Sequence, residues 1–420
     1  MKTYRTLALL LSALSATATA QTRPAALPFI EQVRAAQSIL RVDATGLGGP
    51  GAVTLSDAVN GARYVLVGEA HFSMEIPHFT VALCHLMAAR GLRALAVETG
   101  REAARIVNIN LRRPDRVARL SAFMRAHPDA MAFQNNGAES DMAAACAREA
   151  GPAFQVWGLD QEFFGASGFL LEEMAAASPG PAASMAIHHL KAQDRAATAD
   201  AIASHSPGKF LIYTITDAQM EAARVAIAKD GGLRVTRLFE AFAETRAIYL
   251  ASASGAGDPN GRRARLIKRT LTGYLGTAPA GSRVLIKFGD VHAVKGVNAL
   301  RQRDIGNFVA ERAEGEGVSS LHILVLGAEG QLGAYNGVGQ QVTVNSYTPV
   351  AGTDYPWLKD MLAVRPNQAD GSNWLLLDLR RLRGRPAPDM PAGWRQLVLG
   401  YDLVMVAPKL TPASLIGVEQ

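Results

Sequence analysis

The sequence has few cysteines and few aromatic residues. Only 2 of the 420 residues are cysteine, and aromatic residues make up 6% of the chain. Two cysteines cannot form the disulfide framework of a small secreted scaffold, so a hydrophobic core has to stabilise the fold. The hydrophobic fraction of 49% is ample for one large core, or for one core with a sizeable insertion.

The chain also lacks a strong excess of charge. The formal net charge is +6, and no basic stripe is interleaved with aromatic residues. This composition argues against a nucleic-acid partner and leaves a small molecule or a peptide as the expected substrate. The sequence does not indicate an oligomeric state.

No apolar run is long enough to span a bilayer. Residues 1–20 instead have the pattern of a secretory signal, with Lys2 and Arg5 before the apolar run 8–14 and a small-residue cleavage site ending at Ala20. Cleavage would lower the net charge to +4, because two basic residues and no acidic ones are removed. We therefore expect a periplasmic or secreted protein with no integral membrane segment.

Cys84 and Cys146 are the two cysteines of the mature chain. An exported protein can oxidise them to a disulfide. Both lie in stretches with a helical pattern, where a small buried thiol is an equally good interpretation. The sequence leaves the two alternatives open.

Short apolar runs alternate with helical patterns along most of the chain. The runs predict strands at 63–67, 92–98, 153–160, 282–290, 320–327, 373–379 and 401–407. A helix over 75–90 joins the first two strands, which is a βαβ unit with parallel strands. The fold class predicted is α/β, with a mostly parallel sheet flanked by helices.

Four segments describe the domain organisation that we expect. An N-terminal leader follows the signal over 21–60, with a short helix over 28–40 and a Gly-rich loop at 46–51. An α/β core comprises 61–164 and 279–420, and a helical insertion over 165–278 caps the site. Within it the stretch LIYTIT (211–216) is predicted as helix, and 328–372 is predicted as loop.

Acidic and imidazole groups follow four of the predicted strands. Parallel strands bring their carboxyl ends to one edge of a sheet, so side chains more than 200 positions apart can share a pocket there. The proposed centre consists of Glu69, His71, Glu98 and His292.

Two of these groups occur in the same short frame, Gly68-Glu-Ala-His71 and Gly289-Asp-Val-His292. We expect each glycine to let the backbone turn sharply as it leaves the sheet. One mechanism open to such a cluster is a general base that activates water. The other is a divalent metal, Zn, Mn or Fe, held by His71, Glu98 and His292.

Further polar residues are candidates for substrate binding, each with a structural alternative. Glu75 can instead stabilise the first turn of a helix, where the helix dipole favours an acid. Asp160 and Glu162 can equally be ordinary loop acids, and the basic run with Arg265 and Lys268 can be a helix face in contact with solvent. The candidates are Glu75, Asp160, Glu162, Lys287, Asp290, Arg265 and Lys268.

Four segments resemble one protein superfamily. They are YVLVGEAHFSMEIPHF (64–79), LRALAVETG (92–100), VLIKFGDVHAVKG (284–296) and the ending YDLVMVAPKLTPAS (401–414). They look like the superfamily that joins erythromycin esterases, ChaN-like proteins and the TIKI/TraB proteins. The likeness extends over most of residues 60–415.

The resemblance implies an α/β core with a helical insertion and a site at Glu69, His71, Glu98 and His292. In the esterase branch the matching first histidine, His71 here, activates water for ester or lactone cleavage. The TIKI/TraB branch implies metal-dependent peptide cleavage, and the ChaN branch implies haem or iron binding without turnover. The Glu69–His71 spacing is like the ChaN type, and Phe72 follows His71 where esterases usually have glycine.

Overall fold

The computed structural model describes residues 27–43, 46–366, 372–384 and 387–418. The predicted signal over 1–20 and its cleavage site lie outside the described residues.

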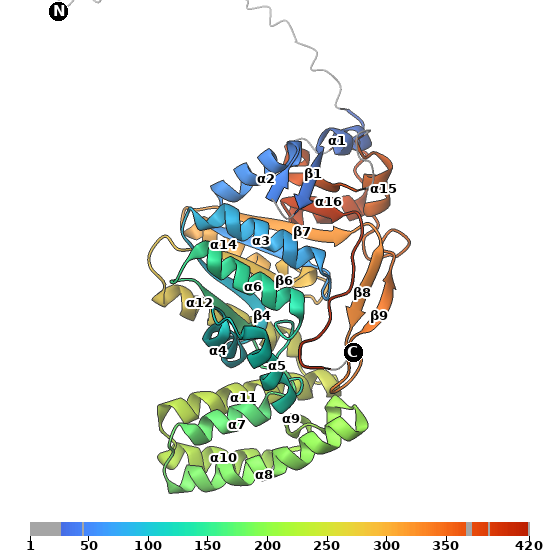
Figure 1. Ribbon diagram of the computed structural model, residues 1–420. Helices are drawn as coiled ribbons and strands as arrows, with labels where there is room; N and C mark the ends of the chain where they lie inside the picture. The colour runs from blue at the N-terminus through green and yellow to red at the C-terminus, as the bar shows by residue number, and fades with distance from the viewer. Residues whose placement is uncertain (1–26, 44–45, 367–371, 385–386, 419–420) are drawn as a thin grey trace, which may run out of the picture.

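A mixed sheet forms the centre of the molecule (Figure 1). In the described part of the chain it has nine strands in the order β2-β1-β10-β11-β7-β3-β6-β4-β5. The pairs from β11 to β5 are parallel, and β10, β1 and β2 are added antiparallel at one edge. The predicted α/β class with a mostly parallel sheet is confirmed. The strands are β1 (Gln37–Asp43), β2 (Gly46–Gly48), β3 (Tyr64–Glu69), β4 (Leu92–Gly100), β5 (Gln155–Asp160), β6 (Arg283–Gly289), β7 (Ser320–Gly327), β10 (Trp374–Asp378) and β11 (Leu403–Ala407).

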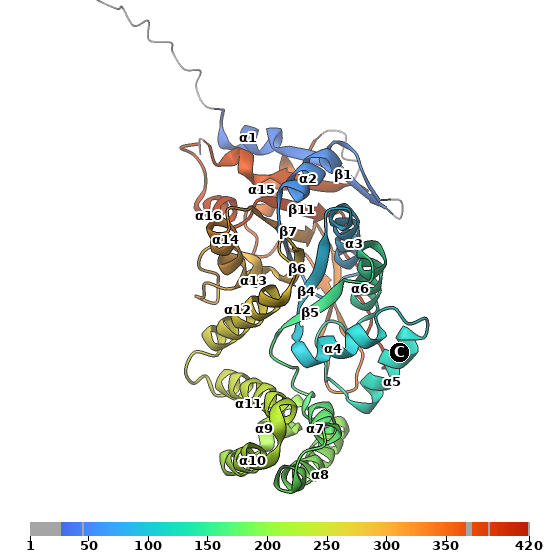
Figure 2. The same cartoon turned by 90° about the vertical axis from the view of Figure 1, so that its left-hand side faces the viewer.

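Helices cover both faces of the sheet, and this explains why its central strands are largely apolar. Val65 and Val67 of β3 pack with the helices on one face, whereas Tyr64 and Leu66 pack with those on the other. Figure 2 shows the two layers on either side of the sheet. One layer contains α2 (Pro50–Gly61), α3 (Glu75–Ala88) and α6 (Gly137–Ala150), and the other contains α12 (Pro259–Thr277), α14 (Ile305–Gly315) and α16 (Ala392–Gly400).

A helical unit lies away from the sheet, between β5 and β6 in the sequence (Figure 1). The stretch predicted as helix at LIYTIT is helical over 211–214. The last helix before β6, α12, does not lie with this unit. It packs Ile267 and Leu271 against the sheet. The helices of the unit are α7 (Ser167–Ala176), α8 (Pro181–Ser204), α9 (Leu211–Thr214), α10 (Asp217–Asp230) and α11 (Gly232–Ser254).

Two segments differ from the sequence prediction. The N-terminal segment has a helix, α1 (Phe29–Ala35), that is shorter than predicted and is followed by β1 and β2 of the sheet, and β2 and the start of α2 stand where a Gly-rich loop over 46–51 was predicted. The predicted loop over 328–372 contains the hairpin β8 (Gly330–Ala334) and β9 (Thr343–Tyr347) and the helix α15 (Leu358–Ala363). β9 is exposed along most of its length, so it has no apolar alternation that a sequence pattern could reveal.

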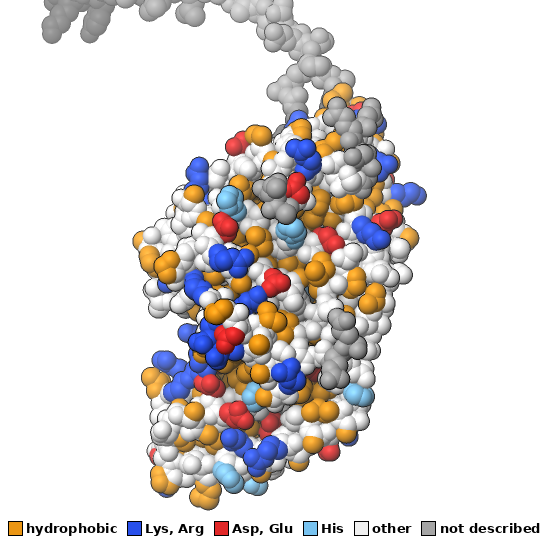
Figure 3. Space-filling view, viewed as in Figure 1, with side chains coloured by type: hydrophobic (Ala, Val, Ile, Leu, Met, Phe, Trp, Pro, Cys, Tyr) orange, Lys and Arg blue, Asp and Glu red, His pale blue; other side chains and the backbone are white. Residues whose placement is uncertain are grey.

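Cys84 and Cys146 form a disulfide between α3 and α6, which settles the alternative that the sequence left open. The remaining helices are α4 (Arg101–Asn110), α5 (Arg116–Ala126) and α13 (Asp290–Ala293). None of the helices in the described ranges is long and apolar enough to cross a membrane. On the face shown in Figure 3, acidic and basic side chains are interspersed with apolar ones.

Candidate active site

The strand order brings the predicted centre together. β6 lies between β3 and β4, so the carboxyl ends of these three parallel strands are neighbours. Glu69 is the last residue of β3, Glu98 lies near the end of β4, and His292 follows β6 in α13. The four residues that the sequence placed in one centre, with His71 after β3, therefore lie at one edge of the sheet.

His71 lies between two carboxylates. Its Nδ1 is 3.0 Å from Glu69 Oε1, and its Nε2 is 3.5 Å from Glu98 Oε2. The ring of Phe133 stacks on the imidazole, with centroids 4.0 Å apart and an interplanar angle of 19°. The contact with Glu69 is a hydrogen bond, whereas the longer one to Glu98 leaves Nε2 less tightly held.

His292 contacts the other oxygen of the same carboxylate. Its Nε2 is 3.7 Å from Glu98 Oε1, and its Nδ1 is 2.6 Å from Asp304 Oδ2. Asp304 is the N-cap of α14, where its other oxygen accepts from the Ile305 amide. Each imidazole thus has its own acid at Nδ1, and Glu98 lies between the two Nε2 atoms.

Arg263 completes this cluster from α12. Its Nη2 donates to Glu98 Oε1 at 2.6 Å, its Nε donates to Asp160 Oδ1 at 3.0 Å, and its Nη1 lies 3.2 Å from His292 Nε2. Asp160, a predicted substrate-binding residue, therefore holds Arg263 in place. No sequence pattern singled out Arg263 as a member of the site.

The two basic residues predicted from the same run do not reach the centre. Arg265 is exposed, and the Lys268 amine donates to the Arg303 carbonyl at 2.8 Å. The buried face of α12 is marked by Ala264, Ile267 and Leu271. At about 100° per residue, Arg263 flanks this face and Arg265 points well away from it, so helical phase could have excluded Arg265.

Lys287 is buried inside the sheet and forms ion pairs with Glu69 and Glu139. Its ammonium is shared by two carboxylates and is not available to a substrate in this arrangement. Burial raises the pKa of Glu139 to about 7, and Lys287 offsets only part of that effect. Burial also raises the pKa of Glu69, but Lys287 and His71 outweigh it and hold that pKa below its usual value. Lys287 therefore keeps Glu69 ionised beside His71.

The glycines of the two histidine frames have a different role from the one predicted. Gly289 has φ −52° and ψ 143°, which any residue adopts. A Cβ atom at Gly289 would lie 2.7 Å from His71 Nε2, and one at Gly68 would lie 2.7 Å from the Tyr401 hydroxyl. Glycine is needed at both positions because other side chains approach the backbone closely, and not because the chain turns sharply there.

The electrostatics of the centre favour protonated histidines. Burial lowers the pKa of His71, but Glu98 and Glu69 outweigh it and raise that pKa to about 10. Burial and Arg263 likewise lower the pKa of His292, whereas Glu98 and Asp304 raise it and prevail. Burial raises the pKa of Glu98, but His292, His71 and Arg263 together hold it well below its ordinary value. Glu98 is therefore a permanent anion between cationic neighbours.

The other predicted residues have structural partners outside this cluster. The Glu75 carboxylate accepts from the backbone and hydroxyl of Thr411 at 2.9 and 2.6 Å. Glu162 accepts from the first amides of α4, including that of Glu102 at 2.7 Å. Asp290 accepts from the Tyr355 hydroxyl at 2.6 Å.

The arrangement does not suit the metal site that the sequence allowed. Within the described ranges, no group of three histidine, cysteine or acidic side chains is placed to hold a metal ion. The Arg263 guanidinium occupies the space next to Glu98 and His292, where a cation bound by those ligands would have to lie.

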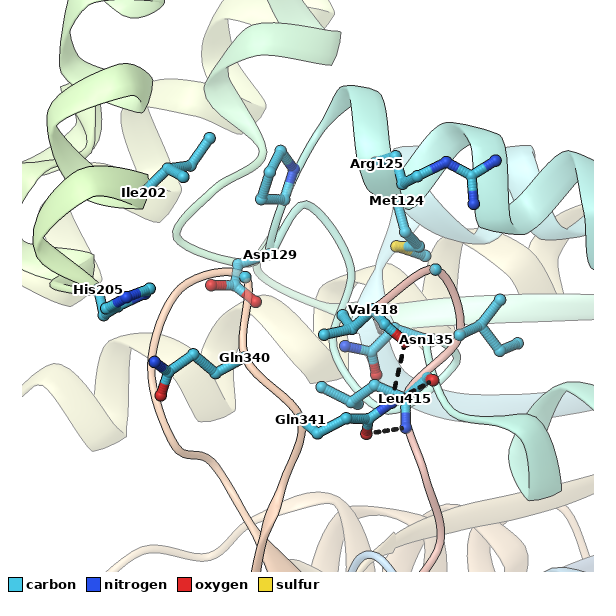
Figure 4. A pocket seen from close by; sticks show the side chains of 14 residues that line it. Met124, Arg125, Asp129, Asn135, Ile202, His205, Gln340, Gln341, Leu415 and Val418 are labelled. Atoms are coloured by element: carbon cyan, nitrogen blue, oxygen red, sulfur yellow. Dashed lines mark hydrogen bonds between the residues drawn. The ribbon is translucent and has the colours of Figure 1, made fainter. Parts of the chain in front are cut away.

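Two cavities lie next to the elements of the site. Asp160 and Glu162 line one of about 810 Å³, between β5, α4, α11 and α12. The other, of about 550 Å³, is lined by the loop after α5, the end of α8, the tip of the β8–β9 hairpin and the segment 415–418 (Figure 4). Asp129 and Asn135 flank Phe133 in the sequence, so the loop that carries Phe133 also lines part of the second cavity.

No protein-family profile matches the sequence, and no curated protein matches it significantly. Three solved structures are similar to the fold. A histidine mutant of the erythromycin esterase EreC in its open conformation has a TM-score of 0.65 and 16% identity, covering 90% of this chain and 98% of that one. A protein described as a succinoglycan biosynthesis protein has a TM-score of 0.57 and 14% identity, covering 92% and 97%.

The third is a Bacillus cereus protein with a TM-score of 0.57 and 11% identity, and the match covers 93% of this chain and 98% of that chain. Identities this low establish the architecture alone, because function depends on the residues of each site. The described chain has the fold of erythromycin esterase, which is the fold that the resemblance of its motifs predicted.

Proposed function

We propose that the protein is an exported hydrolase that activates water to cleave an ester, a lactone or an amide. The observation that supports this most is the pairing of two imidazoles through one carboxylate, Glu98. His71 and His292 each have a second acid at Nδ1, which fixes the ring and leaves Nε2 as the atom that exchanges protons.

In the proposed reaction His71 is the general base. When His71 is neutral, Glu69 accepts from Nδ1–H, and the lone pair on Nε2 takes a proton from water as the water oxygen attacks the carbonyl carbon. His292, whose protonated form is favoured by Glu98 and Asp304, gives its proton to the leaving oxygen or nitrogen. Arg263 holds Glu98 in place between the two rings.

The disulfide supports the proposal that the protein is exported. Disulfides persist in oxidising compartments and are rare in the cytosol. The Cys84–Cys146 bond fits the secretory signal predicted over residues 1–20.

A substrate panel with two histidine variants tests the proposal. The protein, His71→Ala and His292→Ala would be assayed on p-nitrophenyl esters, lactones and peptides. We expect turnover of one class and a loss of about a hundredfold or more in kcat for each variant, with an unchanged circular dichroism spectrum. Full turnover by either variant would show that its assigned role is wrong.

Elemental analysis of the same active preparation separates the alternatives implied by the resemblance. Activity without stoichiometric metal supports the water-activating hydrolase. Bound zinc or manganese with peptide cleavage would instead support the TIKI/TraB type, and would require Arg263 to move away from Glu98. A Soret band on adding haem, with no turnover of any substrate, would support the ChaN type.

A further inference from the structure

Phe133 is the aromatic ring in contact with the proposed base. It stacks on the His71 imidazole with ring centroids 4.0 Å apart, nearly parallel to it, and the centroid of the Phe72 ring lies 5.7 Å away. No motif in the sequence singled out Phe133, which belongs to the loop between α5 and α6.

The backbone at this ring has an energetically unfavourable conformation. Phe133 has φ 56° and Phe72 has φ 61°, in the left-handed region that bulky residues rarely adopt. Such conformations persist only where the surroundings enforce them, and they concentrate at functional sites. Two contacting phenylalanines in this region, one of them against His71, indicate that the position of the ring is specified.

Contacts from distant parts of the chain enforce this conformation. The Asn135 carbonyl accepts from the Ile416 amide at 2.7 Å, and the Phe72 carbonyl accepts from the Ala413 amide at 2.9 Å. The Gln341 side chain at the hairpin tip bonds to the backbone of Leu415 (Figure 4). We name residues 411–418 the strap, because this segment crosses both loops that carry the two phenylalanines.

We propose that Phe133 is a positioning residue for His71, which fixes the plane of the imidazole and favours its protonated form. The face of an aromatic ring carries partial negative charge and attracts a cation above it. The stack covers one face of the imidazole, and at the ring edge Nδ1 contacts Glu69 and Nε2 contacts Glu98. The catalytic part of this proposal rests on the proposed function, whereas the effect on protonation does not.

Several charged groups surround the two carboxylates that contact His71. They come from β6, α6, α12 and α13. These groups are Lys287, Glu139, Arg263 and His292. A replacement that changes only Phe133 leaves all of them in place, so a change in titration would report the ring itself.

The test is the titration of His71 followed by NMR of protein labelled with ¹³C-histidine, with the signal assigned by His71→Gln. Phe133→Leu keeps an apolar group over the imidazole but removes the aromatic face. We expect the proton affinity of His71 to fall roughly five- to thirtyfold. Phe133→Trp restores a stacked ring, and we expect it to titrate like the wild type.

Phe123→Leu is the matched control. Phe123 contacts a different histidine, His127, at 5.1 Å and a tilted 50°, and this pair is separate from the centre. We expect no change at His71. An unchanged titration in Phe133→Leu, or equal changes in Phe133→Leu and Phe123→Leu, would overturn the proposal.

Kinetics on a p-nitrophenyl ester separate this proposal from the hydrolase. On the plateau of the pH profile, where His71 is neutral in both proteins, we expect kcat of Phe133→Leu to be about tenfold lower with little change in KM, because a misoriented base acts after binding. If the wild type hydrolyses nothing while the titration still moves, the hydrolase fails and the positioning of His71 by Phe133 is supported.

Discussion

The pH dependence of His71 gives the sharpest prediction. Its pKa is raised to about 10 because Glu98 and Glu69 outweigh the effect of burial. At pH 7 only about one free molecule in a thousand would then have the neutral imidazole that a base requires. We expect kcat/KM to rise about tenfold per pH unit between pH 7 and 9 and to level off above about pH 10.

This differs from the ordinary expectation for a catalytic histidine, which is a rise between roughly pH 5 and 8. The change to test it is Glu69→Gln, which removes one carboxylate 3.0 Å from Nδ1 and keeps a hydrogen-bond acceptor. Loss of one adjacent opposite charge typically lowers a pKa by about one to three pH units. The rise in kcat/KM should therefore move to lower pH by about one to three pH units, and the plateau value of kcat/KM should be lower.

The assay combines two measurements. ¹³C-histidine NMR gives the pKa of His71 without a substrate, and initial rates on a p-nitrophenyl ester give the pH profile of kcat/KM. An inflection near pH 6.5 in the wild type that does not move in Glu69→Gln would refute the reasoning, because it would mean that neither carboxylate charges the imidazole.

The folding stability of the protein should also depend on the protonation of His71. Since the pKa of His71 is higher in the folded state than in the unfolded state, its contribution is fully present below about pH 6.5 and is lost as the pH rises towards about 10. The difference in melting temperature between the wild type and His71→Gln should therefore shrink across that interval. A difference that grows with pH would contradict the assignment.

Three further predictions follow from single contacts. Gly289→Ala should lower kcat about a hundredfold in a folded protein, because its Cβ would lie 2.7 Å from His71 Nε2 and displace the ring. Removing the Cys84–Cys146 disulfide, which closes a loop of 62 residues, should lower the free energy of unfolding by about 4 kcal/mol in urea denaturation. Asp304→Asn should lower the pKa of His292, measured by NMR, because it removes the carboxylate charge next to Nδ1.

Each of these has a control. For Gly289→Ala, the backbone conformation is open to alanine, so a lost fold would contradict the contact argument. For the disulfide, the Cys84→Ser/Cys146→Ser variant should match the reduced wild type, and equal stability before and after reduction would be inconsistent with the prediction. For Asp304→Asn, the His71 signal serves as the internal reference, and an unmoved His292 signal would count against the pairing.

The parallel part of the fold was predictable because its sheet is buried on both faces, so that each of its strands is a short, nearly continuous apolar run in the sequence. The ends of β3, β4 and β6 carried the polar residues, and parallel pairing then brought Glu69, Glu98 and His292 together. β2 and β9 were missed because they lie at partly or largely exposed positions and have no periodic pattern.

The rest of the site could not be predicted because it depends on tertiary contacts. Arg263 stands in a run of basic residues, and only the phase of α12 distinguishes it from Arg265. In the sequence Asp304 looks like an ordinary N-cap residue, although one of its oxygens contacts His292. Phe133 lies in a loop whose conformation is enforced by residues almost 300 positions away.

The strap has a consequence for the order in which the molecule assembles. The loops that carry Phe72 and Phe133 leave the ribosome long before residues 411–418, which bond to both. Contacts of such sequence separation form late, because a long stretch of chain must be ordered before they add stability. A nascent chain could thus form its sheet strand by strand and still lack a settled reaction centre until this segment arrives.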